Sequence, residues 1–124
     1  MKVAVTSSGR SLDSAVDPRF GRCACFVVVE TDDMSFDAFD NGAASLGGGA
    51  GIQSARAVAE KDAKVVLTGN VGPNAHQALS AAGIQVVTGF SGTVAEAVER
   101  FKAGGLTPAT GPTVASHSGT RGGI

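Results

Sequence analysis

The stretch "AKVVLTGNVGPNAHQALSAAGIQVVTG", residues 63–89, decides the fold. It begins with a short β-branched run at 63–69, continues through a segment with helical character at 70–83, and ends in a second apolar run at 84–89. Short apolar runs bounded by Gly, Thr and Asn are typical of buried strands, and Pro73 suits the first turn of a helix. A strand, a helix and a second strand in this order require parallel pairing with a right-handed crossover. The stretch therefore predicts a βαβ unit.

The flanking sequence extends this unit into an α/β domain of residues 1–105 with a mixed sheet of about five strands. Residues 92–105 predict a helix, because Thr93 and Glu96 have capping-box spacing and an apolar stripe follows. Residues 106–124 have no period and several glycines and prolines, so we expect a disordered C-terminal tail. The remaining predicted elements are strands at 2–7, 23–32 and 34–41, the last two forming a hairpin, and a helix at 51–61.

The composition excludes several classes of protein. The 124 residues carry ten Lys and Arg against eleven Asp and Glu, without a basic stripe, which argues against a nucleic-acid partner. With six Phe and no Trp or Tyr, an aromatic surface for stacking bases is not expected. No apolar run is long enough to span a membrane, and the N-terminus lacks the features of a signal peptide. We therefore expect a cytoplasmic protein. Cys23 and Cys25 are separated by one residue, so a disulfide between them would be strained, and we expect both thiols to be reduced.

A second unusual stretch is "SLGGGAGIQSA", residues 45–55, in which four glycines occupy five positions before a predicted helix. Glycine permits positive φ and close backbone approach, and a helix start directs unpaired N–H groups at whatever lies in front of it. The stretch lacks the lysine of a phosphate-binding P-loop and the glycine spacing of a dinucleotide fingerprint. A ligand-binding helix start and a plain surface loop both remain open from this segment alone.

The predicted topology favours the ligand-binding interpretation of this stretch. Loops that follow parallel strands meet at one edge of the sheet, where α/β proteins bind ligands. The loops after the predicted strands at 2–7, 63–69 and 84–89 are rich in small polar residues and contain no carboxylate. If the glycine loop joins them, three helix starts converge on one concavity that favours a compact anion. Arg10, Arg19 and Arg22 could supply positive charge from neighbouring turns.

Catalytic residues are hard to identify, and we expect no enzyme. His76 and His117 are interpreted as surface residues, and the aspartates around the hairpin as a solvated face. Cys23 and Cys25 have two open interpretations. They are soft ligands for copper, zinc or iron–sulfur centres, although two thiolates do not complete a tetrahedral site. They also suit a buried strand as small apolar side chains.

Five segments resemble the dinitrogenase iron–molybdenum cofactor biosynthesis family: "MKVAVTSSG", "VDPRFGRCACFVVVE", "GGAGI", "GPNAHQALSAAGIQVV" and "GTVAEAVERFKAGGL". The resemblance covers about residues 1–106. It implies a ribonuclease-H-like, three-layer α/β fold with a mixed five-stranded sheet and no nuclease function. It also implies binding or carriage of a metal–sulfur cluster. In nitrogenase-accessory members the cargo is the iron–molybdenum cofactor or its precursor, whereas in small stand-alone members it is an anionic molybdenum–copper sulfide cluster held without covalent protein ligands.

The leading hypothesis is therefore a carrier of a molybdenum–copper sulfide cluster, with or without a protein that donates or accepts the cluster. Many relatives have histidine where this chain has Arg19, and an arginine there suits outer-sphere attraction to an anion. The alternatives are an iron–molybdenum cofactor chaperone acting through a partner protein and, ranked last, a small hydrolase. No metal ligand is assigned. The predicted binding residues are Arg19, Arg22, Gly48, Gly49, Gly51, Ile52, Gly72 and Asn74.

Overall fold

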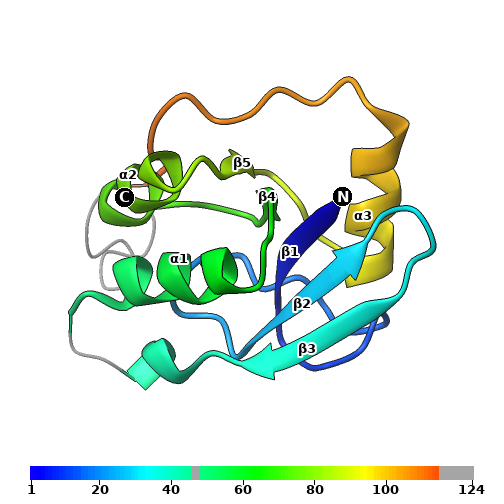
Figure 1. Cartoon of the computed structure of the whole chain (residues 1–124), viewed down its shortest axis with the longest axis horizontal. Coiled ribbons are helices and arrows are strands. Elements are labelled where there is room, and N and C mark those ends of the chain that lie inside the picture. Colours follow the sequence, from blue (N-terminus) through cyan, green and yellow to red (C-terminus); the bar gives the residue numbers. More distant parts are fainter. Residues whose placement is uncertain (46–47, 115–124) are drawn as a thin grey trace.

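The computed structural model describes residues 1–45 and 48–114, and in this part of the chain five strands form one mixed sheet (Figure 1). The sheet order is β3-β2-β1-β4-β5, with antiparallel pairing on the β2–β3 side of β1 and parallel pairing on the β4–β5 side. The α/β class and the mixed five-stranded sheet are thus confirmed. The elements are β1 (Lys2–Ser7), β2 (Cys25–Glu30), β3 (Phe36–Asp40), a 3₁₀ turn η1 (Gly42–Ser45), α1 (Ala50–Glu60), β4 (Val65–Leu67), α2 (Pro73–Ala81), β5 (Gln85–Val87) and α3 (Val94–Ala103).

The sheet separates two hydrophobic cores. Alternation along the central strand places Ala4 in the core beneath α1 and α2, while Val3 and Val5 face the core beneath α3. Strand β1 is therefore buried on both faces, as a central strand between two helical layers must be. The helices on opposite faces give the molecule three layers, and the crossovers bring the starts of α1 and α2 side by side.

Residues 106–114 of the tail that the sequence predicted to be disordered make hydrogen bonds with the folded domain. After α3 this segment crosses the β5 edge, where the Ala109 N–H donates to the Val86 carbonyl at 2.7 Å (Figure 1). It then reaches the loop before α2, where the Thr113 N–H donates to the Val71 carbonyl at 2.7 Å. Because the order of this segment comes from these distant carbonyls, no local period in its sequence indicated it. Residues 115–124 of the predicted tail lie outside the described residues.

Candidate functional site

Two glycines bring three segments into backbone contact. On α1, a Cβ added at Gly51 would lie only 2.9 Å from the Cβ of Ala75 on α2. Gly21, in the turn before β2, has a φ of +96°, and a Cβ there would lie 3.1 Å from the Cα of Gly51. Because only glycine permits these approaches, the segment around Gly21 and the starts of α1 and α2 pack against each other directly.

The starts of α1 and α2 both present unpaired N–H groups. Their N-caps are Gly49 and Gly72, which have no side chain to accept a hydrogen bond. Within residues 1–45 and 48–114, no acceptor contacts the N–H groups of the first turn of α1 or those of Asn74 and Ala75 on α2. Neither first turn carries an acidic residue, so the positive ends of both helix dipoles are uncompensated there.

The start of α3 does not join them, which corrects the prediction that three helix starts converge. Thr93 and Glu96 form the predicted capping box. The N–H groups of Val94 and Ala95, in the first turn of α3, donate to the carbonyls of Ser14 and Leu12, at 2.9 Å each. All four donors at this helix start are thus satisfied within the protein, and α3 packs on the opposite face of the sheet. The site has two open helix starts.

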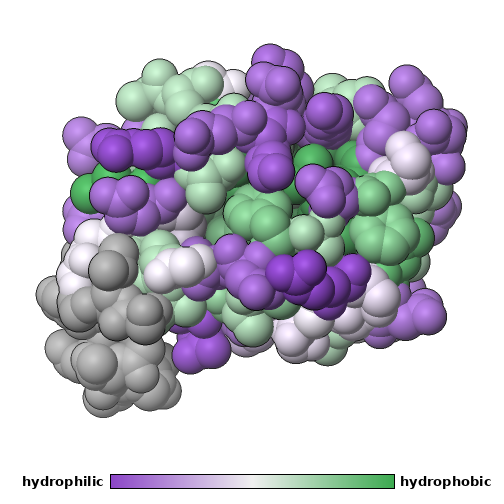
Figure 2. Space-filling model, turned by 60° about the horizontal axis from the view of Figure 1, so that its bottom comes forward, coloured by the Kyte–Doolittle hydropathy of each residue, from purple (hydrophilic) through white to green (hydrophobic). Residues whose placement is uncertain are grey.

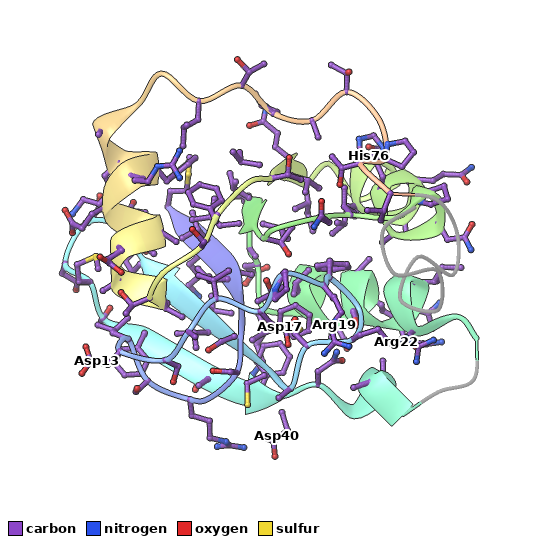
Figure 3. All side chains as sticks on the ribbon, turned by 180° about the vertical axis from the view of Figure 1, so that it is seen from behind. Asp13, Asp17, Arg19, Arg22, Asp40 and His76 are labelled. Carbon is purple, nitrogen blue, oxygen red and sulfur yellow. The ribbon has the colours of Figure 1, made fainter. Side chains whose placement is uncertain are left out.

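Two predicted arginines stand beside these open starts. The backbone of Arg19 forms an isolated β-bridge with that of Asn70, in the loop before α2. The Arg22 side chain donates a hydrogen bond to the Ala44 carbonyl at 3.1 Å, in the turn before α1. Figure 3 shows Asp17, Arg19 and Arg22 following one another along residues 17–22, here called the arginine segment. Sequence reasoning missed Asp17, whose carboxylate lies 3.4 Å from the Arg19 Nε. Arg10, by contrast, forms an ion pair with Asp40 at 3.0 Å, at the end of β3.

The other predicted residues lie on the same two helix starts. Gly48 and Gly49 are exposed, and Gly49 takes the left-handed conformation at the N-cap of α1. Ile52 is 41% exposed although it is apolar, and it lies in the first turn of α1. Asn74 is exposed in the first turn of α2. The structure therefore brings the glycines at the starts of α1 and α2 together with the apolar side chain of Ile52 and the amide side chain of Asn74.

Small polar residues of the sheet-edge loops have an internal role. Thr6 and Thr68 are fully buried, and their hydroxyls are 2.9 Å apart at the ends of β1 and β4. Thr6 also donates to the Asp17 carbonyl at 2.6 Å and accepts the Asp17 N–H at its own carbonyl. These hydroxyls anchor the arginine segment to the sheet.

Asn41 links the arginine segment to α1, and the sequence carried no signal for it beyond a turn-forming residue type. Its buried amide donates to the carbonyls of Gly21 and Cys23 at 3.1 and 3.0 Å. Its side-chain oxygen accepts from the Ser54 hydroxyl on α1 at 3.1 Å and from the Ala43 N–H at 3.2 Å. One side chain therefore fixes the arginine segment relative to both α1 and the turn before it.

The two cysteines are free and buried. Cys23 packs in the core beneath α1 and α2, where burial, with a further contribution from the Asp17 carboxylate, raises the pKa of its thiol to about 12. Burial also raises the pKa of the Cys25 thiol, which donates to Asp40 at 3.5 Å. Both thiols therefore stay protonated near neutral pH, which favours the packing interpretation over thiolate ligation.

The described residues do not assemble a set of side-chain ligands for a metal ion. They contain no group of three or more His, Cys, Asp and Glu side chains that could hold a metal ion. The His76 ring contacts the Ala109 carbonyl at 3.2 Å, and His117 lies outside the described residues. No helix in the described part of the chain has the length and apolar character needed to cross a membrane.

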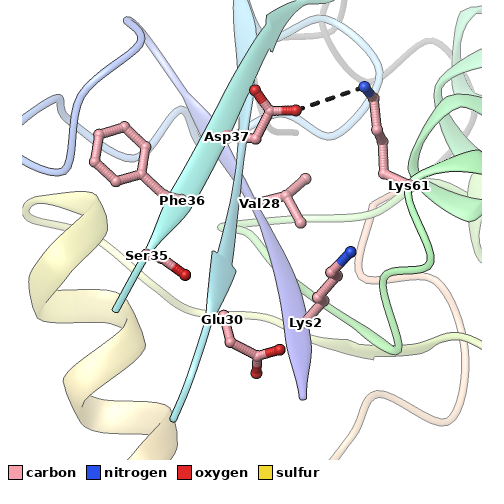
Figure 4. A pocket seen from close by; sticks show the side chains of 7 residues that line it. All are labelled: Lys2, Val28, Glu30, Ser35, Phe36, Asp37 and Lys61. Carbon is pink, nitrogen blue, oxygen red and sulfur yellow. Dashed lines mark ion pairs between the residues drawn. The ribbon is translucent and has the colours of Figure 1, made fainter. Parts of the chain in front are cut away.

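A separate pocket of about 230 Å³ lies beyond the C-terminal end of α1 (Figure 4). Two lysines and two carboxylates line it, and Lys61 and Asp37 form an ion pair at 3.6 Å. Because its charges balance, this pocket does not select for an anion. On the face in Figure 2, apolar side chains reach the surface in several areas separated by hydrophilic residues, so this view shows no single extended apolar patch.

The chain belongs to the dinitrogenase iron-molybdenum cofactor family, whose model matches residues 1–104, as the resemblance indicated. The apo form of the orange protein from Desulfovibrio gigas is 50% identical, with a TM-score of 0.87 over 90% of this chain and 95% of that one. A putative NifB protein from Thermotoga is 33% identical, with a TM-score of 0.78 over 90% and 96% of the two chains. An uncharacterised protein from Methanocaldococcus jannaschii is 28% identical over 109 residues, which are 86% of this chain and 89% of that relative.

Proposed function

We propose that this protein binds and carries an anionic metal–sulfide cluster without covalent ligands and without catalysing a reaction. The observation that carries the proposal is the pair of open helix starts at α1 and α2, in contact through Gly51 and flanked by Arg19 and Arg22. Family membership supports a cluster as the anion. The finer assignments, a ribonuclease-H-like fold and a cytoplasmic location, belong to the same proposal.

The physical basis is the sum of several moderate interactions. A hydrogen bond from a neutral donor to a charged acceptor contributes about 1.5–3 kcal/mol, and each helix dipole adds about 0.3–1 kcal/mol for an anion at its N-terminus. The open donors of α1 and α2 therefore supply several such interactions to one anion without a metal–protein bond. Ile52 provides an apolar wall, which suits polarisable sulfide better than strongly hydrated phosphate.

We further propose a molybdenum–copper sulfide cluster as the cargo. The similarity to the orange protein supports this choice, as does an arginine at position 19, which attracts an anion but does not ligate a metal. The family description also favours a second candidate, an iron–molybdenum cofactor or its precursor, delivered through a protein that donates or accepts it. The second candidate predicts affinity for a nitrogenase assembly protein.

The test is reconstitution of the apo-protein with tetrathiomolybdate and Cu(I). We expect a coloured complex of fixed stoichiometry that survives gel filtration. The double variant Arg19→Gln, Arg22→Gln should bind more weakly and with less dependence on salt, because two positive charges near the anion are lost. The double variant Arg100→Gln, Lys102→Gln is the matched control, since it also removes two positive charges but on α3, on the opposite face of the sheet. Absence of a stable coloured complex with the wild-type chain would refute the proposal.

A further inference from the structure

The segment of residues 106–114, here called the C-terminal strap, ends at the start of α2. Leu106 packs against the core beneath α3, and Ala109 hydrogen-bonds both the β5 edge and the His76 ring of α2. The strap then reaches Val71, one residue before the N-cap Gly72. The family match ends at residue 104, so the strap comes from sequence beyond the matched region.

Both backbone polar groups of Val71 use the strap. The Val71 N–H donates to the Thr113 hydroxyl at 2.8 Å, and the Val71 carbonyl accepts from the Thr113 N–H at 2.7 Å. Val71 is only 1% exposed, so these groups depend on protein partners. Thr113 thus supplies what a neighbouring strand would otherwise supply, across 42 positions of sequence.

Asn70, the residue before Val71, is hydrogen-bonded to the arginine segment. The Asn70 N–H donates to the Pro18 carbonyl at 2.8 Å, and the Asn70 carbonyl accepts from the Phe20 N–H at 3.3 Å. Pro18 and Phe20 flank Arg19. Adjacent residues of one loop therefore connect the strap to the arginine segment, and the same loop leads directly into the open N–H groups of α2.

We infer that Thr113 is a positioning residue for the anion site, setting the start of α2 and, through Asn70, the place of Arg19. This inference rests on the proposed function for its ligand, but the positioning itself is a property of the apo-protein. It predicts that a change at Thr113 alters the site although Thr113 contacts the loop before α2 and is not one of the predicted binding residues.

The test compares Thr113→Val, which removes the hydroxyl at nearly constant volume, with Thr113→Ser, which retains it. Thr110→Val is the matched control, because Thr110 is exposed on the strap and makes no hydrogen bond within the described part of the chain. In the apo-protein, Thr113→Val should speed hydrogen exchange at the Val71 amide and shift the amide resonances of Asn74 and Arg19. Its affinity for the tetrathiomolybdate–Cu(I) species should fall roughly two- to tenfold, the equivalent of one neutral hydrogen bond. Thr113→Ser should restore both properties, and Thr110→Val should change neither.

The two readouts separate the two ideas. If Thr113→Val leaves the Asn74 and Arg19 resonances of the apo-protein unmoved, the strap has no positioning role, whatever the uptake. Unchanged affinity in a variant whose resonances do move would also overturn the inference. Failure of the wild-type chain to take up the cluster refutes the proposed function instead, while the apo resonances still decide the role of Thr113.

Discussion

Substitution of Gly51 by alanine tests the contact on which the site is built. The new Cβ would lie 2.9 Å from the Cβ of Ala75, whereas carbon atoms in contact are normally about 3.5–4.0 Å apart. Neither atom can rotate away, so the starts of α1 and α2 must separate by about 1 Å. Overpacking of this kind costs about 1–3 kcal/mol, while replacing glycine by alanine in a helix returns up to about 1 kcal/mol. We expect a net loss of about 1 kcal/mol in the free energy of unfolding.

Urea and thermal unfolding measure this loss, which corresponds to a melting temperature lower by about 4 °C for a domain of this size. Gly42→Ala is the matched control, because a Cβ at Gly42 meets nothing within 4 Å and should leave stability within about 0.5 kcal/mol of wild type. Cluster uptake by Gly51→Ala should weaken as well, since the two sets of N–H groups no longer face one anion at the same spacing. A variant that is more stable than wild type by about 1 kcal/mol and binds fully would show that the contact imposes no constraint.

Three further predictions concern the cap of α3, the Asn41 side chain and the Cys23 thiol. Thr93→Ala should lower the free energy of unfolding by about 1 kcal/mol through loss of the α3 cap, with cluster uptake unchanged; reduced uptake would mean that the start of α3 belongs to the site. Asn41→Ala should cost about 2 kcal/mol or more in urea unfolding, because buried carbonyls lose their donor, and a cost near zero would contradict its linking role. Cys23 keeps its proton up to a pKa of about 12, against an ordinary value of 9.0, so the unfolded chain releases this proton first as pH rises. The stabilisation that comes from the raised pKa of Cys23 is fully present below pH 9.0. Above pH 9.0 the free energy of unfolding falls by about 1.4 kcal/mol per pH unit, up to about pH 12. Urea unfolding of wild type and Cys23→Ala from pH 8 to 10.5 should therefore show stabilities whose difference changes with pH, and a constant difference would refute the raised pKa.

Local sequence determined the secondary structure and the class of the fold. The apolar run at 63–69 and the βαβ order predicted parallel strands, and the spacing of Thr93 and Glu96 predicted a capping box that the structure contains. These features depend on neighbours within a few positions of the chain, where hydrophobic period and capping preference act. The glycine-rich stretch likewise predicted a helix at 51–61, and α1 spans Ala50–Glu60.

Only the tertiary structure decided which helix starts remain open. Two of the four donors at the start of α3 are satisfied by Ser14 and Leu12, about 80 positions earlier in the chain, and no local pattern indicates such partners. The role of Gly51 as a packing contact, the burial of Asn41, and the connection from Thr113 to the start of α2 likewise depend on segments that are distant in sequence. The physical reason is that hydrogen bonds and van der Waals contacts act through space, so the availability of an N–H group is settled when the chain has folded around it.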